Sequence, residues 1–140
     1  MSGCDFVVSG ENFEVDKYLE TSPLARSAVS IFRRGELTGL SSHPITQRSG
    51  FRIEFFEFGG LGIEAAIASS IGFLDQHRDA IVQAKNWPGV EQCEISILMA
   101  WFEDTAALPL ELPANFLQLA GSLGVSLSIN ICATQRDGVQ

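Results

Sequence analysis

The chain has 140 residues, of which 46% are hydrophobic, so it is large enough to bury a core without disulfides or a structural metal. This composition excludes an intrinsically disordered chain. The formal net charge of −8 argues against direct nucleic-acid binding, which requires a basic surface. We expect one domain over residues 1–140, with residues 135–140 as a loose tail.

The first half of the chain predicts three strands and one helix. Residues 5–9 are β-prone and end at a glycine, and residues 13–20 follow an asparagine suited to cap a helix. A second strand is expected over residues 28–34. Residues 37–50 are polar and turn-rich, which is typical of a surface loop. Residues 51–58 alternate between apolar and polar side chains and therefore predict a third strand.

The second half predicts two helices and two strands. Residues 63–85 contain no proline and carry one apolar stripe at helical spacing, so we expect a single long helix. Residues 92–102 become apolar on both faces, which favours a central strand. A helix over residues 113–123 and a strand over residues 125–131 complete the chain. Within the predicted central strand, at least one of Trp101 and Phe102 is expected to be buried.

The predicted element order is β-α-β-β-α-β-α-β, and it indicates an α+β fold. Its first six elements match the split βαβ of ferredoxin-like folds. We therefore expect a mainly antiparallel sheet with helices packed on one face, consisting of a ferredoxin-like core plus an extra helix and strand.

No catalytic or metal-binding pattern is found in the sequence. The three cysteines, Cys4, Cys93 and Cys132, are odd in number and lack zinc-ligand spacing. A nucleophile activated by histidine needs its partners within hydrogen-bond reach, and nothing in the sequence gives Cys93 or Cys132 an activating neighbour; the only histidines are His43 and His77. We expect no catalytic residue, no metal and no cofactor. There is neither a signal-peptide pattern nor an apolar run of ~18 residues, so we expect a cytoplasmic protein without membrane contact.

Two charged segments are candidate binding surfaces. Residues 26–52 carry five arginines and one glutamate, a balance of +4, so the remainder of the chain carries −12. Within this segment Arg33, Arg34 and Arg52 are candidates to bind an anion such as a carboxylate or phosphate. The alternative is that these arginines pair with acidic residues of the chain itself.

The second surface lies on the predicted long helix. At 100° per residue, Glu64, Asp75 and Asp79 fall on one side of that helix, together with the small Ala68. These three carboxylates are candidate contacts for a basic protein partner. A merely solvated helix face would have a similar pattern, and this alternative stays open.

The sequence also resembles a bacterial family, domain-of-unknown-function family 4279. The resemblance covers most of the chain and is carried by the segments Phe6-Val7-Val8-Ser9-Gly10, Arg33-Arg34-Gly35-Glu36 and Ser49-Gly50-Phe51, and by the Leu117–Ile129 pattern of spaced leucines and isoleucines. The family has no established activity to carry over. Some similar small acidic bacterial proteins are immunity proteins encoded beside toxins.

Two functional hypotheses follow from these observations. The first is a non-enzymatic binding protein, in its sharpest form an immunity-type inhibitor whose acidic surface occludes a basic toxin. The second is a small-molecule or anion-binding module that uses Arg33 and Arg34.

Overall fold

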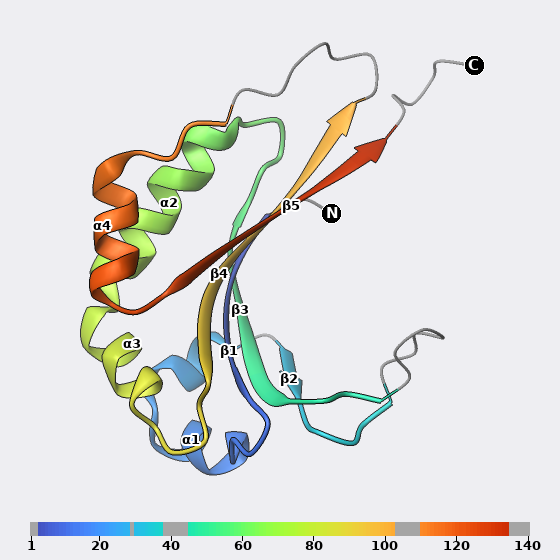
Figure 1. The fold of residues 1–140 in the computed structure, drawn as a ribbon, viewed down its shortest axis with the longest axis vertical. Helices are drawn as coiled ribbons and strands as arrows, with labels where there is room; N and C mark the ends of the chain where they lie inside the picture. Colours follow the sequence, from blue (N-terminus) through green and yellow to red (C-terminus); the bar gives the residue numbers. More distant parts are fainter. Residues whose placement is uncertain (1–2, 29, 38–44, 103–109, 135–140) are drawn as a thin grey trace.

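The computed structural model describes residues 3–28, 30–37, 45–102 and 110–134, which form a five-stranded sheet with helices on one side (Figure 1). The elements in chain order are β1 (Gly3–Gly10), α1 (Val15–Thr21), the 3-10 helix η1 (Pro23–Ser27), β2 (Ser30–Phe32), β3 (Ser49–Glu57), α2 (Ile63–Gln76), α3 (Arg78–Lys85), β4 (Gln92–Phe102), α4 (Ala114–Ser122) and β5 (Ser126–Thr134). The predicted α+β class, with helices packed on a sheet, is confirmed. Among the described residues, no helix is long and apolar enough to cross a membrane.

The strand order is β2-β3-β1-β4-β5. β1 lies between β3 and β4 and is antiparallel to both, while β2 is antiparallel to β3. This is the split βαβ arrangement: β3 and β4 run parallel, and β1 is inserted between them. β5 is then added parallel to β4 after the α4 crossover. The sheet is therefore mixed, with three antiparallel pairs and one parallel pair.

The core lies between the sheet and the helices. On β1, Cys4, Phe6 and Val8 alternate with outward-facing residues and are fully buried. Phe73 of α2 packs against Phe6, with ring centroids 5.3 Å apart, and stacks on Phe55 of β3 at 4.6 Å. These ring contacts attach α2 to the two strands at the middle of the sheet.

A second aromatic cluster holds α1 on the other end of the sheet. Tyr18 is fully buried and stacks on Phe51 of β3 at 5.4 Å, and it meets the edge of Trp87 at 5.2 Å. Phe13 contacts both Tyr18 and Phe51. These contacts close the sheet end where β1 and β4 are joined to the helices.

The predicted single helix over residues 63–85 is wrong in one respect, because it breaks at His77. α2 ends at Gln76 and α3 begins at Arg78, with His77 at φ −111° and ψ 23°. α2 packs on β1 and β3, whereas α3 packs on β4, and the break turns the chain from one region of the twisted sheet to the next. Both Leu74 and Ile81 are fully buried as a result.

Several other boundaries differ from the predictions. The strand predicted over residues 28–34 is only three residues long, since the chain turns at Arg33–Glu36 around Gly35, whose φ is +92°. Leu37 and Ile45 form an isolated bridge within the predicted loop. Residues 38–44, the tail 135–140, and the side chains of Trp101 and Phe102 lie outside the described part of the structure. The strand that contains Trp101 and Phe102 is β4, an interior strand of the sheet.

Gly89 is the glycine on which the loop between α3 and β4 depends. Its φ is +87°, and an added Cβ would lie 2.5 Å from the carbonyl oxygen of Asn12 and 2.9 Å from the Cα of Phe13. Gly72 differs because it lies in α2 with no neighbouring atom within 4 Å of an added Cβ.

We expect Gly89→Ala to lower the free energy of unfolding by at least about 1–2 kcal/mol, the cost of a left-handed conformation alone. Gly72→Ala, the matched control, should raise it by about 0.5–1 kcal/mol, because alanine favours the helix. Urea denaturation measures both changes. A Gly89→Ala variant as stable as the wild type would contradict this close approach.

Candidate functional site

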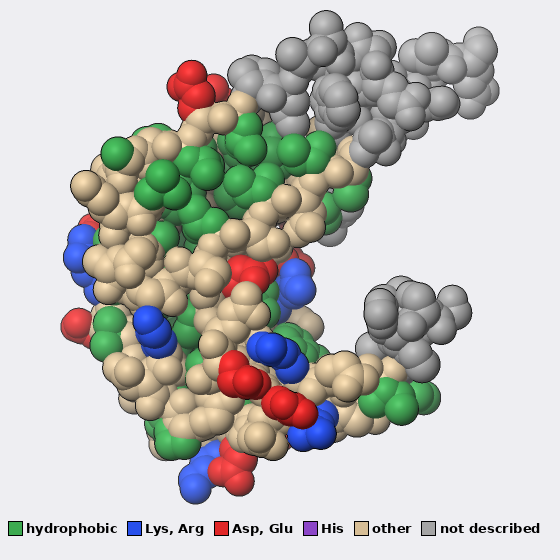
Figure 2. Space-filling model, viewed as in Figure 1, with side chains coloured by type: hydrophobic (Ala, Val, Ile, Leu, Met, Phe, Trp, Pro, Cys, Tyr) green, Lys and Arg blue, Asp and Glu red, His purple; other side chains and the backbone are tan. Residues whose placement is uncertain are grey.

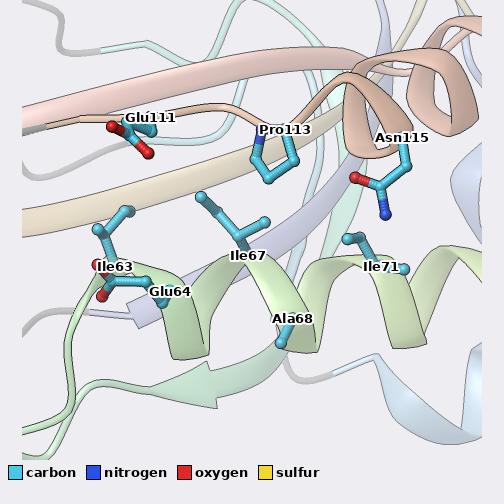
Figure 3. A pocket seen from close by; sticks show the side chains of 8 residues that line it. All are labelled: Ile63, Glu64, Ile67, Ala68, Ile71, Glu111, Pro113 and Asn115. Carbon is cyan, nitrogen blue, oxygen red and sulfur yellow. The ribbon is translucent and has the colours of Figure 1, made fainter.

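A groove of about 410 Å³ lies between α2 and the segment that leads into α4 (Figure 3). Its lining residues are Ile63, Glu64, Ile67, Ala68, Ile71, Glu111, Pro113 and Asn115. The first five come from α2 and the last three from residues 111–115, so segments far apart in the sequence form its two walls. The groove is the candidate functional site.

Local sequence explains both walls of the groove. Isoleucines at positions 63, 67 and 71 recur every four residues, so they line up along one side of α2. On the opposite wall, Pro113 precedes α4 with its φ fixed at −61°, and this restricts the path of the chain over α2. Helices α2 and α4 pack directly on each other. The groove therefore has an apolar floor and a stiff upper wall.

The polar groups of the groove are two carboxylates and one amide. Glu64 and Glu111 are exposed at one end, and Asn115 lies at the other (Figure 3). Among the described residues, the groove has no basic lining residue and neither carboxylate forms an ion pair. An apolar trough with a negative end is suited to a ligand that combines an apolar body with a positive charge.

Glu64 also has a structural role. It lies in the first turn of α2, where a carboxylate is favoured by the partial positive charge of the helix N-terminus. That role accounts for an acidic residue at this position, but not for Glu111, which lies outside any helix. The helix-terminus effect therefore does not explain why two carboxylates, Glu64 and Glu111, line the same groove.

The predicted row of Glu64, Asp75 and Asp79 is not brought together in the structure. Glu64 and Asp75 share α2, but they are eleven positions apart, which is about 16 Å along the helix axis. Asp79 belongs to α3, beyond the break at His77. The carboxylate of Asp75 is also paired with Arg78 at 2.9 Å. Of the three predicted partner-binding residues, only Glu64 lines the groove.

The predicted anion-binding arginines are each paired with an acidic residue. Arg33 donates two hydrogen bonds to the carboxylate of Asp16 in a bidentate arrangement, with N–O distances of 2.7 and 2.9 Å. These hydrogen bonds lower the pKa of the Asp16 carboxyl below its ordinary value. Arg34 lies 3.4 Å from the carboxylate of Glu11.

The third arginine, Arg52, also forms an ion pair, and it lies on the side of the sheet opposite the helices. Arg52 of β3 pairs with Asp5 of β1 on this uncovered face. A wider, more open hollow beside Arg33 is lined by four charged residues of α1 and its N-cap: Glu14, Asp16, Lys17 and Glu20. The three candidate arginines are thus compensated by acids from the first third of the chain.

Sequence reasoning found Glu64 and Ala68 but missed Glu111, Pro113 and Asn115 as parts of one site. The sequence predicted that Pro113 begins a helix, and it shows Glu111 two positions earlier, but neither feature indicated a binding site. Nothing local in the sequence places residues 111–115 over α2, because that contact is between distant segments.

The cysteines do not form a reactive site. Cys4 and Cys93 are buried, and this burial raises the pKa of each thiol to about 11. Cys132 is exposed on β5. Among the described residues, no group of three or more histidine, cysteine, aspartate or glutamate side chains could hold a metal ion.

Comparison of the chain with family models, curated proteins and solved structures finds no match. The resemblance to domain-of-unknown-function family 4279 therefore stays a prediction.

We expect a thiol reagent at pH 8 to modify no more than one cysteine per folded chain, and all three after unfolding. Only the thiolate reacts, and a pKa of about 11 leaves roughly one thiol in a thousand ionised at that pH. A Cys132→Ser variant should be inert when folded and expose two thiols in urea. Modification of Cys4 or Cys93 in the folded protein, detected by mass spectrometry, would contradict their placement in the core.

Proposed function

We propose that this protein is a non-enzymatic binding protein whose groove between α2 and residues 111–115 engages a basic partner protein. The observation that carries the proposal is the pair of exposed carboxylates, Glu64 and Glu111, on an apolar groove whose described lining contains no basic residue. A lysine or arginine side chain fits this chemistry, since its aliphatic stem packs on the isoleucines while its charged head reaches a carboxylate.

The charge of the whole chain supports the same choice of partner. A net charge of −8 attracts a basic protein over a distance set by the salt concentration, and it repels acidic ones. The arginines of the alternative hypothesis are paired within the chain, so the anion-binding function has less geometric support.

The sharpest form of the proposal is an immunity-type inhibitor. In this form the partner is a toxin with a basic active-site rim. The acidic groove docks on that rim and keeps the toxin's substrate out, so inhibition requires occlusion and no chemistry by this chain.

Two charge-matched double variants test the groove. Glu64→Lys with Glu111→Lys and Asp75→Lys with Asp79→Lys each shift the net charge by +4, since every reversal adds two units. Any basic protein captured from a lysate of the source cells by the wild type should bind the first variant at least about tenfold more weakly, a loss of about 1.4 kcal/mol. The partner should dissociate from the second variant at the same rate as from the wild type, because Asp75 and Asp79 lie outside the groove.

The wild-type association rate should fall as salt is added, while the dissociation rate changes less. Binding kinetics at several salt concentrations measure both rates. If the captured partner binds the two double variants equally well, the groove is not its docking site. If no protein partner is found, including the product of any neighbouring toxin gene, the binding function itself is wrong.

A further inference from the structure

The outer edge of β5 is the longest open strand edge in the described part of the structure. β5 runs over nine residues, Ser126–Thr134, and all nine are paired with β4 on one side only. Among the described residues, no strand pairs with its other side. In the view of Figure 1, β5 crosses the front of the sheet. A row of backbone N–H and C=O groups on that side is available to another strand.

This edge lacks the usual features that prevent strands from pairing between molecules. Its sequence, Ser-Leu-Ser-Ile-Asn-Ile-Cys-Ala-Thr, has no charged residue and no proline, and its register with β4 runs without a bulge. The opposite edge of the sheet is β2, which has only three residues and is followed directly by Arg33 and Arg34. The chain as a whole carries a net charge of −8 and would repel a second copy, but the β5 edge carries no charge. A second acidic molecule can therefore approach this edge closely.

The β5 sequence is self-complementary about Asn130. An antiparallel copy centred there places Asn130 opposite Asn130, Ile129 opposite Ile131 and Ser128 opposite Cys132. Polar residues then meet polar or small residues on the uncovered face, and apolar residues meet apolar residues on the helix-covered face. The faces are fixed by the β4 register, which pairs Ile129 with the buried Ile97.

The apolar side chains beside this edge are incompletely covered. Ile131 is 42% exposed, and Leu127 and Ile129 are only partly buried. Leu117, on the α4 helix that leads to β5, is 46% exposed. Figure 2 shows hydrophobic side chains gathered on the same face, above the course of β5. Pairing with a second strand would cover the isoleucines of β5. It would also add one contact between Ile129 and Ile131 of the two copies on each side of Asn130.

We propose that β5 pairs antiparallel with β5 of a second copy of this chain, about a two-fold axis through Asn130. The axis is perpendicular to the sheet, so the helices of both copies stay on the same side and the two sheets join into one of ten strands. The interface is isologous, because each copy offers the same strand edge. It leaves the groove at α2 independent, since the lining residues described for that groove lie on α2 and residues 111–115.

Charge substitutions at the axis test this pairing. The wild type should sediment as a dimer of twice the 15.2 kDa chain mass and dissociate on dilution. Asn130→Glu and Asn130→Lys each place like charges opposite each other, and each should weaken the dimer at least about tenfold. An equimolar mixture of the two variants should restore a dimer. Ser30→Glu, on the exposed opposite edge at β2, is the control and should leave the dimer intact.

A cross-link provides a second test that does not depend on the charge variants. With Ser128→Cys, the new thiol lies opposite Cys132 of the other copy, at a spacing that a disulfide can bridge. Oxidised glutathione should accept two electrons per bond formed, become two reduced glutathiones and leave a covalent dimer on a non-reducing gel. Ser126→Cys, two residues out of register, should stay uncross-linked.

A wild type that is monomeric at every concentration would overturn the proposal. So would Asn130 variants that remain dimers, a mixture that fails to associate, or a Ser128→Cys protein that gives no more covalent dimer than Ser126→Cys.

Discussion

The rest of the structure depends on β1, which holds the sheet together from its centre. All eight of its residues pair with β3 on one side and seven of them pair with β4 on the other, so the strands on both sides are joined through it. Its buried face, with Cys4, Phe6 and Val8, is part of the surface on which α2 packs. Because each helix must reach this face or its neighbours across a twisted sheet, the segment after β3 cannot stay straight and divides into α2 and α3 at His77.

Both proposed interaction surfaces require the part of the chain added beyond the split βαβ unit. The segment leading into α4 forms the upper wall of the groove and supplies Glu111, and β5 forms the open edge of the sheet. Without this extension, β4 would be the edge strand and α2 would lack the wall that closes its isoleucine row into a groove. The core unit therefore supplies the fold and the α2 wall of the groove, while the added segment supplies the opposite wall and the open β5 edge.

The sequence predicted most of the fold because its signals are local. Alternating apolar residues in the strands, a long apolar stripe after residue 62 and turn residues between them were sufficient for the element order and the α+β class. The break at His77 was missed because no proline or glycine marks it. It accompanies the packing of α2 on β1 and β3 and of α3 on β4, which are contacts between distant segments. The site was harder to predict. The sequence placed Glu64 on a helix, but its proximity to Glu111 in one groove depends on contact between distant segments.

Residue-resolved amide hydrogen exchange tests the central position of β1 most directly. Buried strands at the centre of a sheet exchange only through global unfolding, whereas short edge strands open locally. The amides of Phe6 and Val8 should therefore be among the slowest in the protein, and that of Ile31 in β2 much faster. If the β1 amides exchanged as fast as those of β2, β1 would not be the strand that holds the sheet together.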